Sequence, residues 1–268
     1  QLNTVDVCNT ISLPGDAGEF LDTLHVIEFN IMRGSKWSEA VNLIRKTGDP
    51  DIVLINEADW GMSRSDNEHV TRLMAFELGM NYAWGVEFVE LTPGDHEETQ
   101  NSRTANDCPK DRRGVSFEGK LNALGLHGNA ILSKFPLRDV HIVRSPGIEH
   151  IYGVNSTITA NGFEVRLGGR MILYATIEPV PNMIVHIGCF HHQMLWDRGE
   201  QLAALGRPSL RQMKEVHKRM DPSGSHMFIL GGDGWSTSWC EEIGIPAVHD
   251  YVGGDWICAR GLLPKYFR

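Results

Sequence analysis

Long apolar runs are absent from the 268-residue sequence, which has no stretch of about 18 apolar residues of the kind that spans a membrane. We therefore expect no transmembrane segment. Internal repeats and low-complexity linkers are also absent, which favours one large domain. Hydrophobic residues form 41% and charged residues 22% of the chain, so there is enough apolar material for a substantial core.

Positive charge is scarce relative to negative charge. Lys and Arg number 25 against 34 Asp and Glu, which gives a formal net charge of −9. An acidic protein lacks the broad positive field that non-specific binding to duplex DNA requires. A local basic cleft stays open as an alternative, but duplex DNA is not the expected partner.

Closely spaced cysteines are missing as well, because the five cysteines are scattered and none forms a Cys-x-x-Cys pair. A structural zinc site is therefore not expected, whereas one or two disulfides would fit an oxidising compartment. The sequence starts at Gln1 instead of methionine, which indicates processing, and Asn155-Ser156-Thr157 is a glycosylation sequon. These features lean towards a secreted protein or the lumen of an organelle.

Most apolar residues fall into runs that are too short to span a membrane and are typical of buried strands. Residues 1–23 are polar and predict a loop-rich N-terminal extension, and the domain itself is expected over residues 24–268. Weak alternation over 138–168 predicts strands and hairpins. Longer apolar runs predict core strands at residues 24–31, 51–57, 125–133, 170–177, 183–190, 228–233 and 255–259.

Helical spacing of apolar residues predicts two helices between the first strands. The first runs over residues 37–44 with Ser35 as its N-cap. The second covers residues 70–78, between Asp66 as N-cap and Gly79 as the residue that ends it.

Two further segments have a different character. The polar stretch 92–121 predicts a surface insertion, and insertions of this length are usually functional or disordered. A helical region is expected at 196–220, divided by Pro208, because an interior proline removes a hydrogen bond from the helix.

Polar residues stand at the ends of several predicted strands. The clearest case is the run Phe-Ile-Leu-Gly-Gly-Asp at 228–233, where three apolar residues lead through two glycines to a carboxylate. Each such ending has an ordinary structural explanation by itself, but together they suggest a site, because open α/β sheets bind ligands at strand ends. The residues concerned are Asn30, Glu57, Asn129, His191, Asp233 and Asp255. Their oxygens suit Mg²⁺, and a histidine beside them can transfer a proton near neutral pH.

Four motifs in a fixed order give the sequence a family resemblance. They are Phe-Asn-Ile at 29–31, Asp-Ile-Val-Leu-Ile-Asn-Glu at 51–57, Gly-Asn-Ala-Ile-Leu-Ser at 128–133 and Gly-Gly-Asp at 231–233. Their order and spacing resemble the endonuclease/exonuclease/phosphatase superfamily, also called DNase I-like. The resemblance implies a four-layer α/β sandwich, with two mixed β-sheets packed face to face and helices outside. It also implies metal-dependent cleavage of phosphoesters.

The resemblance implies specific roles for the metal-binding and substrate-binding residues. Glu57 matches the principal metal-binding glutamate of the family, and Asn30 matches the asparagine beside it. Asn129 matches the strand asparagine near the cleft, and Arg170 lies where some members have an arginine that contacts phosphate. The implied cofactor is Mg²⁺ or Mn²⁺.

The resemblance also implies catalytic residues. His191 matches the histidine that follows a core strand, with His192 as the alternative because the surrounding sequence differs from the family's. Asp233 matches the first residue of the family's Asp-x-Asn, and Asp255 matches the aspartate of the penultimate strand motif.

Two departures from the family pattern bear on activity. The Asp-x-Asn motif reads Asp233-Gly234-Trp235, so an indole replaces the asparagine. No Ser-Asp-His occurs anywhere, and Arg268 falls where the approach to that strand should begin. We therefore expect little or no phosphoester turnover from residues 1–268, and turnover from a chain that supplies such a strand.

Two hypotheses follow. The first is a Mg²⁺-dependent hydrolase acting on a small phosphoester, a lipid headgroup or a nucleotide, with Glu57 on the metal and His191 and Asp233 activating the reacting groups. The second is a catalytically degenerate relative that serves as a binding or assembly subunit of a larger complex. Glu57, Asn30, His191 and Asp233 favour the first, and Trp235 favours the second.

Overall fold

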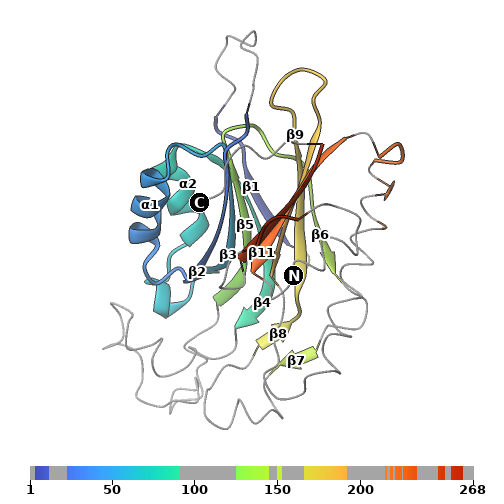
Figure 1. Ribbon diagram of the computed structural model, residues 1–268. Coiled ribbons are helices and arrows are strands. Elements are labelled where there is room, and N and C mark those ends of the chain that lie inside the picture. The colour runs from blue at the N-terminus through green and yellow to red at the C-terminus, as the bar shows by residue number, and fades with distance from the viewer. Residues whose placement is uncertain are drawn as a thin grey trace, which may run out of the picture.

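A computed structural model of the chain shows two β-sheets that pack against each other (Figure 1). The residues that it describes are 4–11, 23–90, 125–144, 150–152, 166–191, 215, 218–219, 221–224, 226–233, 247–250 and 255–261.

The first sheet has seven strands, in the order β2-β3-β5-β4-β8-β7, with β1 also paired to β4. β2 and β3 are parallel, whereas β5 runs antiparallel to both β3 and β4, so the sheet is mixed. Its strands are β1 (Val5–Cys8), β2 (Val26–Arg33), β3 (Ile52–Trp60), β4 (Asn81–Glu90), β5 (Gly125–Ser133), β7 (His150–Tyr152) and β8 (Arg166–Gly168).

The second sheet has six strands, in the order β12-β13-β11-β10-β9-β6. β10 and β11 are parallel and their other neighbours are antiparallel, so this sheet is mixed too. Its strands are β6 (Arg138–Arg144), β9 (Met171–Ile177), β10 (Val185–His191), β11 (Met227–Asp233), β12 (Ala247–Asp250) and β13 (Asp255–Arg260).

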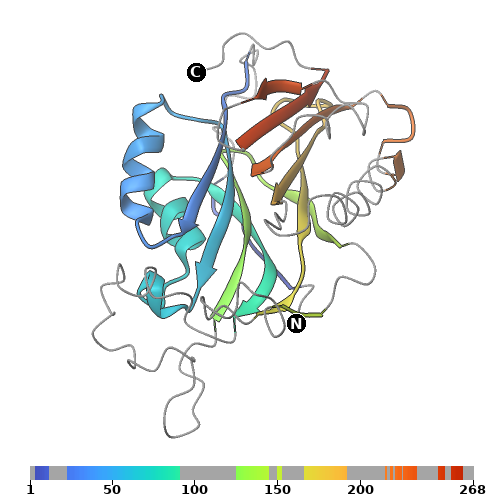
Figure 2. The ribbon, with the colours of Figure 1, turned by 60° about the horizontal axis from the view of Figure 1, so that its bottom comes forward.

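Helices α1 (Trp37–Lys46) and α2 (Val70–Leu78) cover the side of the first sheet that faces away from the second (Figure 2). A short 3₁₀ turn, η1 (Ser63–Ser65), lies before α2. No helix among the described residues is long and apolar enough to cross a membrane. Of the helical region expected at 196–220, the structure describes only Glu215, Lys218 and Arg219, and these three residues are helical.

The helix caps differ in part from expectation. Ser35 was expected to cap α1, but α1 begins after Lys36 and has no side-chain cap. Asp66 was expected to cap α2, but the ring of His69 accepts the backbone N–H of the first turn instead. Gly79 ends α2 in the left-handed conformation, as predicted, because glycine carries no Cβ to oppose a φ of 64°.

Two apolar cores lie on opposite faces of the first sheet, and β3 contributes to both. Val53 and Ile55 pack against the helices, while Ile52 and Leu54 face the second sheet. This explains why β3 is a continuous apolar run, since a strand covered on both faces has no solvent side. Residues of the second sheet, such as Leu173, pack against Ile52 and Leu54 in the core between the two sheets.

The architecture confirms the predicted α/β fold of two mixed sheets packed face to face. The extension at 1–23, expected to be loop-rich, contributes strand β1. Strands β4 and β12 were not predicted. The insertion expected at 92–121 lies outside the described residues, as does nearly all of the helical region expected at 196–220.

Gly128 is required by close backbone packing between β5 and β4. A Cβ at this position would lie 1.9 Å from the carbonyl oxygen of Gly85, a backbone atom that cannot rotate away. We expect Gly128→Ala to lower the free energy of unfolding by about 3 kcal/mol, at the upper end of overpacking effects. Urea unfolding measures this. Gly85→Ala is the matched control, because its Cβ meets only flexible side-chain ends at 3.0–3.2 Å. Equal losses in the two variants would contradict the explanation.

Candidate active site

A β-bulge in β3 positions Glu57. Ile55 pairs with Ala130 and Ala58 with Gly128, so Asn56 and Glu57 together oppose one residue of β5. Successive side chains of a regular strand point to opposite faces. The extra residue and the positive φ of Glu57, 60°, let both side chains face the second sheet. A second bulge, in β4, lies at Glu87.

The second sheet supplies a row of polar residues at the end of three adjacent strands. His191 of β10 is the register partner of Asp233 of β11, and Asp233 is the register partner of Asp255 of β13. The three residues singled out in the sequence as catalytic are therefore neighbours along one edge of the sheet. The side chain of Asp255 lies outside the described part of the structure, as do Trp235 and His192.

Hydrogen bonds between the sheets hold Asp233 in place. Asn30 donates from Nδ2 to Asp233 Oδ2 at 2.8 Å, and the Asp233 backbone N–H donates to Asn56 Oδ1 at 2.8 Å. Asn56 in turn donates from Nδ2 to Asn129 Oδ1 at 3.0 Å and to the Phe190 carbonyl at 3.1 Å. Asn30, Asn129 and Asp233, taken from separate motifs in the sequence, thus belong to one network.

His191 lies among four charged groups. Arg170 donates from Nη1 to His191 Nδ1 at 2.7 Å and to Glu87 Oε2 at 2.9 Å. Because an arginine can only donate, Nδ1 must accept, and the proton of the neutral ring is on Nε2. This nitrogen lies 3.7 Å from Glu57 Oε1 and 4.0 Å from Asp233 Oδ2.

Glu57 is the residue of the site best suited to hold a divalent cation. Burial would raise its pKa, but electrostatic interactions with His191, His127, Arg33 and Arg170 hold that pKa well below its ordinary value, so the carboxylate is ionised. Its contacts with two of these residues are long, 3.7 Å to His191 and 3.8 Å to Arg33. The oxygens are thus charged and have capacity for a metal ion, which fits the donor set of Mg²⁺.

Both polar side-chain atoms of Asn30, which was predicted as a metal ligand, already make hydrogen bonds. Its Oδ1 accepts the backbone N–H of Met32 at 2.9 Å while its Nδ2 holds Asp233. One lone pair of Oδ1 remains, so metal binding by Asn30 stays a prediction. The arrangement that is present makes Asn30 a residue that orients Asp233.

Sequence reasoning missed three residues of the site, namely Asn56, Glu87 and His127. All three are fully buried. Asn56 and His127 stand inside runs that were read as core strands, and Glu87 stands in a strand that was not predicted. The available signal was the aromatic and β-branched run Tyr-Ala-Trp-Gly-Val-Glu-Phe-Val at 82–89, which is typical of a strand and carries one acidic residue.

We expect the loss of folding stability at acid pH to depend in part on the ionisation of Glu87. Burial would raise its pKa, but Arg170 and His191 lower that pKa from 4.5 to about 2. A depressed folded-state pKa adds stability that is present above pH 4.5 and is lost as the pH falls towards 2. We expect Glu87→Gln to remove on the order of 3 kcal/mol of pH-dependent stability in this window.

Urea unfolding at a series of pH values measures this slope. Glu77→Gln, at an exposed carboxyl group, is the control and should retain the slope of the parent chain. A slope unchanged by Glu87→Gln would contradict the assignment.

Comparisons with known proteins show which solved structures share this fold. No protein-family model and no curated sequence matches the chain. Among solved structures, an endonuclease/exonuclease/phosphatase from Beutenbergia cavernae gives a TM-score of 0.54 at 16% identity, covering 89% of this chain and 64% of that one. This chain therefore spans less than two thirds of that protein's length.

Two further structures are similar over most of their length. Sphingomyelinase C from Streptomyces griseocarneus gives a TM-score of 0.53 at 12% identity, covering 90% of this chain and 85% of that one. A variant of Staphylococcus aureus beta toxin with bound magnesium ions gives a TM-score of 0.52 at 13% identity, covering 90% of this chain and 86% of that one. The chain therefore has the DNase I-like fold that its motifs predict.

Proposed function

We propose that the chain carries the site of a Mg²⁺-dependent phosphoester hydrolase. The observation that supports this best is the meeting of Glu57, His191 and Asp233 from three strands of two sheets, with His191 Nε2 within 3.7 Å of Glu57 and 4.0 Å of Asp233. An ionised carboxylate, a histidine and a second carboxylate in contact supply the metal ligand and proton-transfer groups that phosphoester hydrolysis uses.

Each residue has a distinct role in this proposal. Glu57 would hold Mg²⁺ or Mn²⁺, which polarises phosphoryl oxygens when bound. His191 would donate its Nε2 proton to a phosphoryl oxygen. Asp233, oriented by Asn30, would accept a proton from the attacking water. Asp255 is proposed to support this chemistry from the neighbouring strand, where it is the register partner of Asp233.

Two residues are proposed to bind the substrate. Asn129 has a buried Nδ2 without a partner among the described residues, which leaves a donor available for a phosphoryl oxygen. Arg170 brings positive charge to the same place, where it contacts Glu87 and His191.

The substrate is proposed to be a small phosphoester, a lipid headgroup or a nucleotide. The net charge of −9 supports this class over duplex DNA, because little counterion release would drive binding to the duplex. The similarity to sphingomyelinase C supports a lipid headgroup within the class.

A panel of three substrates in Mg²⁺ at low salt tests the proposal. We expect slow hydrolysis of bis-p-nitrophenyl phosphate, whose leaving group needs no proton, and slower turnover of sphingomyelin vesicles, whose alkoxide leaving group needs one. Supercoiled plasmid should stay intact. Hydrolysis that persists in excess EDTA, or plasmid nicking faster than ester hydrolysis, would contradict the proposal.

The alternative is a degenerate relative that acts as a subunit of a larger complex. It is favoured by Trp235 in place of the family asparagine. Binding of Mg²⁺ that depends on Glu57, combined with no turnover of any of the three substrates, would support this alternative.

An oxidising location is proposed for the protein. Cys258 takes part in a disulfide, which supports a secreted protein or an organelle lumen, because disulfides persist in those compartments. Cys8 and Cys189 are free thiols. The sequon at Asn155 points in the same direction, and a mass shift on treatment with a glycosidase would test it.

A further inference from the structure

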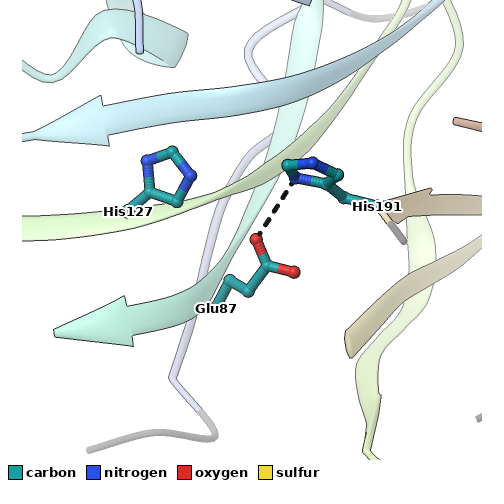
Figure 3. Close-up of side chains that lie close together, drawn as sticks. All are labelled: Glu87, His127 and His191. Atoms are coloured by element: carbon teal, nitrogen blue, oxygen red, sulfur yellow. Dashed lines mark ion pairs between the residues drawn. The ribbon is translucent and has the colours of Figure 1, made fainter. Parts of the chain in front are cut away.

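Three buried side chains form a compact cluster, and of these the proposed hydrolysis uses His191 as its proton donor but neither Glu87 nor His127. Glu87, His127 and His191 each offer one ligand atom, and these atoms all lie within 4.8 Å of one another. They come from three different strands, β4, β5 and β10, and so from both sheets (Figure 3). Glu57 is not a member of the cluster.

Two polar atoms of this cluster are buried without a partner. His127 Nε2 and Glu87 Oε1 make no hydrogen bond within the described part of the chain, although both residues are fully buried. Unsatisfied buried polar groups are costly, and each one calls for an explanation such as an ion that binds there.

The free nitrogen of His127 is prepared to bind a metal. Its Nδ1 lies 2.8 Å from Asp59 Oδ1, and Asp59 is held by Arg64 at 2.6 and 3.0 Å. The carboxylate fixes the ring proton on Nδ1, so Nε2 carries the lone pair. Burial lowers the pKa of His127 and keeps the ring neutral. A neutral histidine whose second nitrogen is held by a carboxylate is the usual arrangement of a metal-bound histidine.

The cluster already stabilises positive charge. Arg170 Nη1 lies 2.9 Å from Glu87 Oε2 and 2.7 Å from His191 Nδ1, so a cationic group contacts two of the three residues. His127 Nε2 is left without such a partner. A metal ion could engage all three residues, with Arg170 displaced from its present contacts.

We propose that Glu87, His127 and His191 form a second metal site, selective for a transition-metal ion such as Zn²⁺ or Co²⁺ over Mg²⁺. Two imidazole nitrogens and one carboxylate are a ligand set of zinc sites, whereas Mg²⁺ prefers oxygen ligands and retains several waters. The site at Glu57, in contrast, offers oxygen ligands. Binding at the second site does not depend on whether the chain hydrolyses phosphoesters.

Titration of the tag-free 268-residue chain with Co²⁺ tests the proposal. Co²⁺ held by nitrogen and oxygen ligands in a protein absorbs visible light more strongly than the hydrated ion. We expect saturable absorption with one equivalent of Co²⁺, which Zn²⁺ displaces and a large excess of Mg²⁺ does not.

Substitutions assign the signal to the cluster. His127→Asn keeps an amide that donates to Asp59 but removes Nε2, and it should weaken Co²⁺ binding by at least about 10-fold. His69→Asn is the matched control, since both nitrogens of His69 are engaged, by Asp6 and by the first turn of α2. It should leave Co²⁺ binding unchanged.

A second variant keeps the test decisive if His127→Asn fails to fold, as judged by circular dichroism. Glu87→Gln should then show the same loss of Co²⁺ binding. The proposal is overturned if the parent chain gives no such absorption, if folded variants of the cluster retain it, or if Glu57→Gln removes it.

Discussion

Replacing His191 with alanine should lower Mg²⁺-dependent hydrolysis of bis-p-nitrophenyl phosphate by at least about 100-fold, the usual scale for loss of a proton-transfer group. The ring contacts three carboxylates, which accept hydrogen bonds and do not donate them, and one arginine, which contacts the other ring nitrogen. None of these neighbours is placed to replace the Nε2–H group as a proton donor. Initial rates of nitrophenolate release measure the effect.

A matched histidine substitution separates this chemistry from a general effect on folding. His69→Asn preserves the cap of α2, because asparagine also accepts hydrogen bonds at an N-cap, and it should retain the parent rate. If His191→Ala kept more than about a tenth of the parent rate, His191 would not be the proton-transfer group.

Replacing Arg64 with methionine should lower the free energy of unfolding by about 3–5 kcal/mol. Arg64 is fully buried and bonds to Asp59 at 2.6 and 3.0 Å and to Glu90 at 3.2 Å. Its loss leaves the Asp59 carboxylate in the interior without its arginine and leaves Glu90 with only Arg166 among the described residues, at 3.2 Å. Asp59 is also the residue that orients His127. Urea unfolding with a check of the m-value measures the change.

Arg45→Met is the control for this substitution. Arg45 forms an ion pair of similar length with Glu77, 3.1 Å, but both side chains are nearly half exposed. Exposed pairs of this kind contribute less than about 1 kcal/mol. Similar losses in Arg64→Met and Arg45→Met would mean that burial is not what makes the Arg64 network important.

The strands that carry the site were largely predictable, because each is a buried apolar run that carries a polar residue. β10 and β11 end at His191 and Asp233 as predicted, whereas Asn30 and Asn129 lie inside β2 and β5, not at their ends. The structure joins all four through hydrogen bonds or short contacts. Apolar runs are visible in a sequence because strands covered on both faces have no polar side.

The parts that could not be predicted depend on local register. The motif at 51–57 identified Glu57, but alternation along a strand would put Asn56 and Glu57 on opposite faces, and only the bulge in β3 brings both towards the second sheet. Glu87 and His127 were missed for a related reason. Each is a single polar residue in an apolar strand. It belongs to the site because of residues on neighbouring strands, and the sequence alone does not show which strands are neighbours.

Calorimetric titration with Mg²⁺ tests the central claim, that Glu57 is the metal-binding carboxylate of a DNase I-like site. The parent chain and Glu57→Gln are compared at pH 7, where the carboxylate of the parent chain is ionised. We expect the parent chain to bind Mg²⁺ and the Glu57→Gln chain, which has the same shape but no charge at this position, to bind at least about 10-fold more weakly. Equal binding by the two chains would contradict the account.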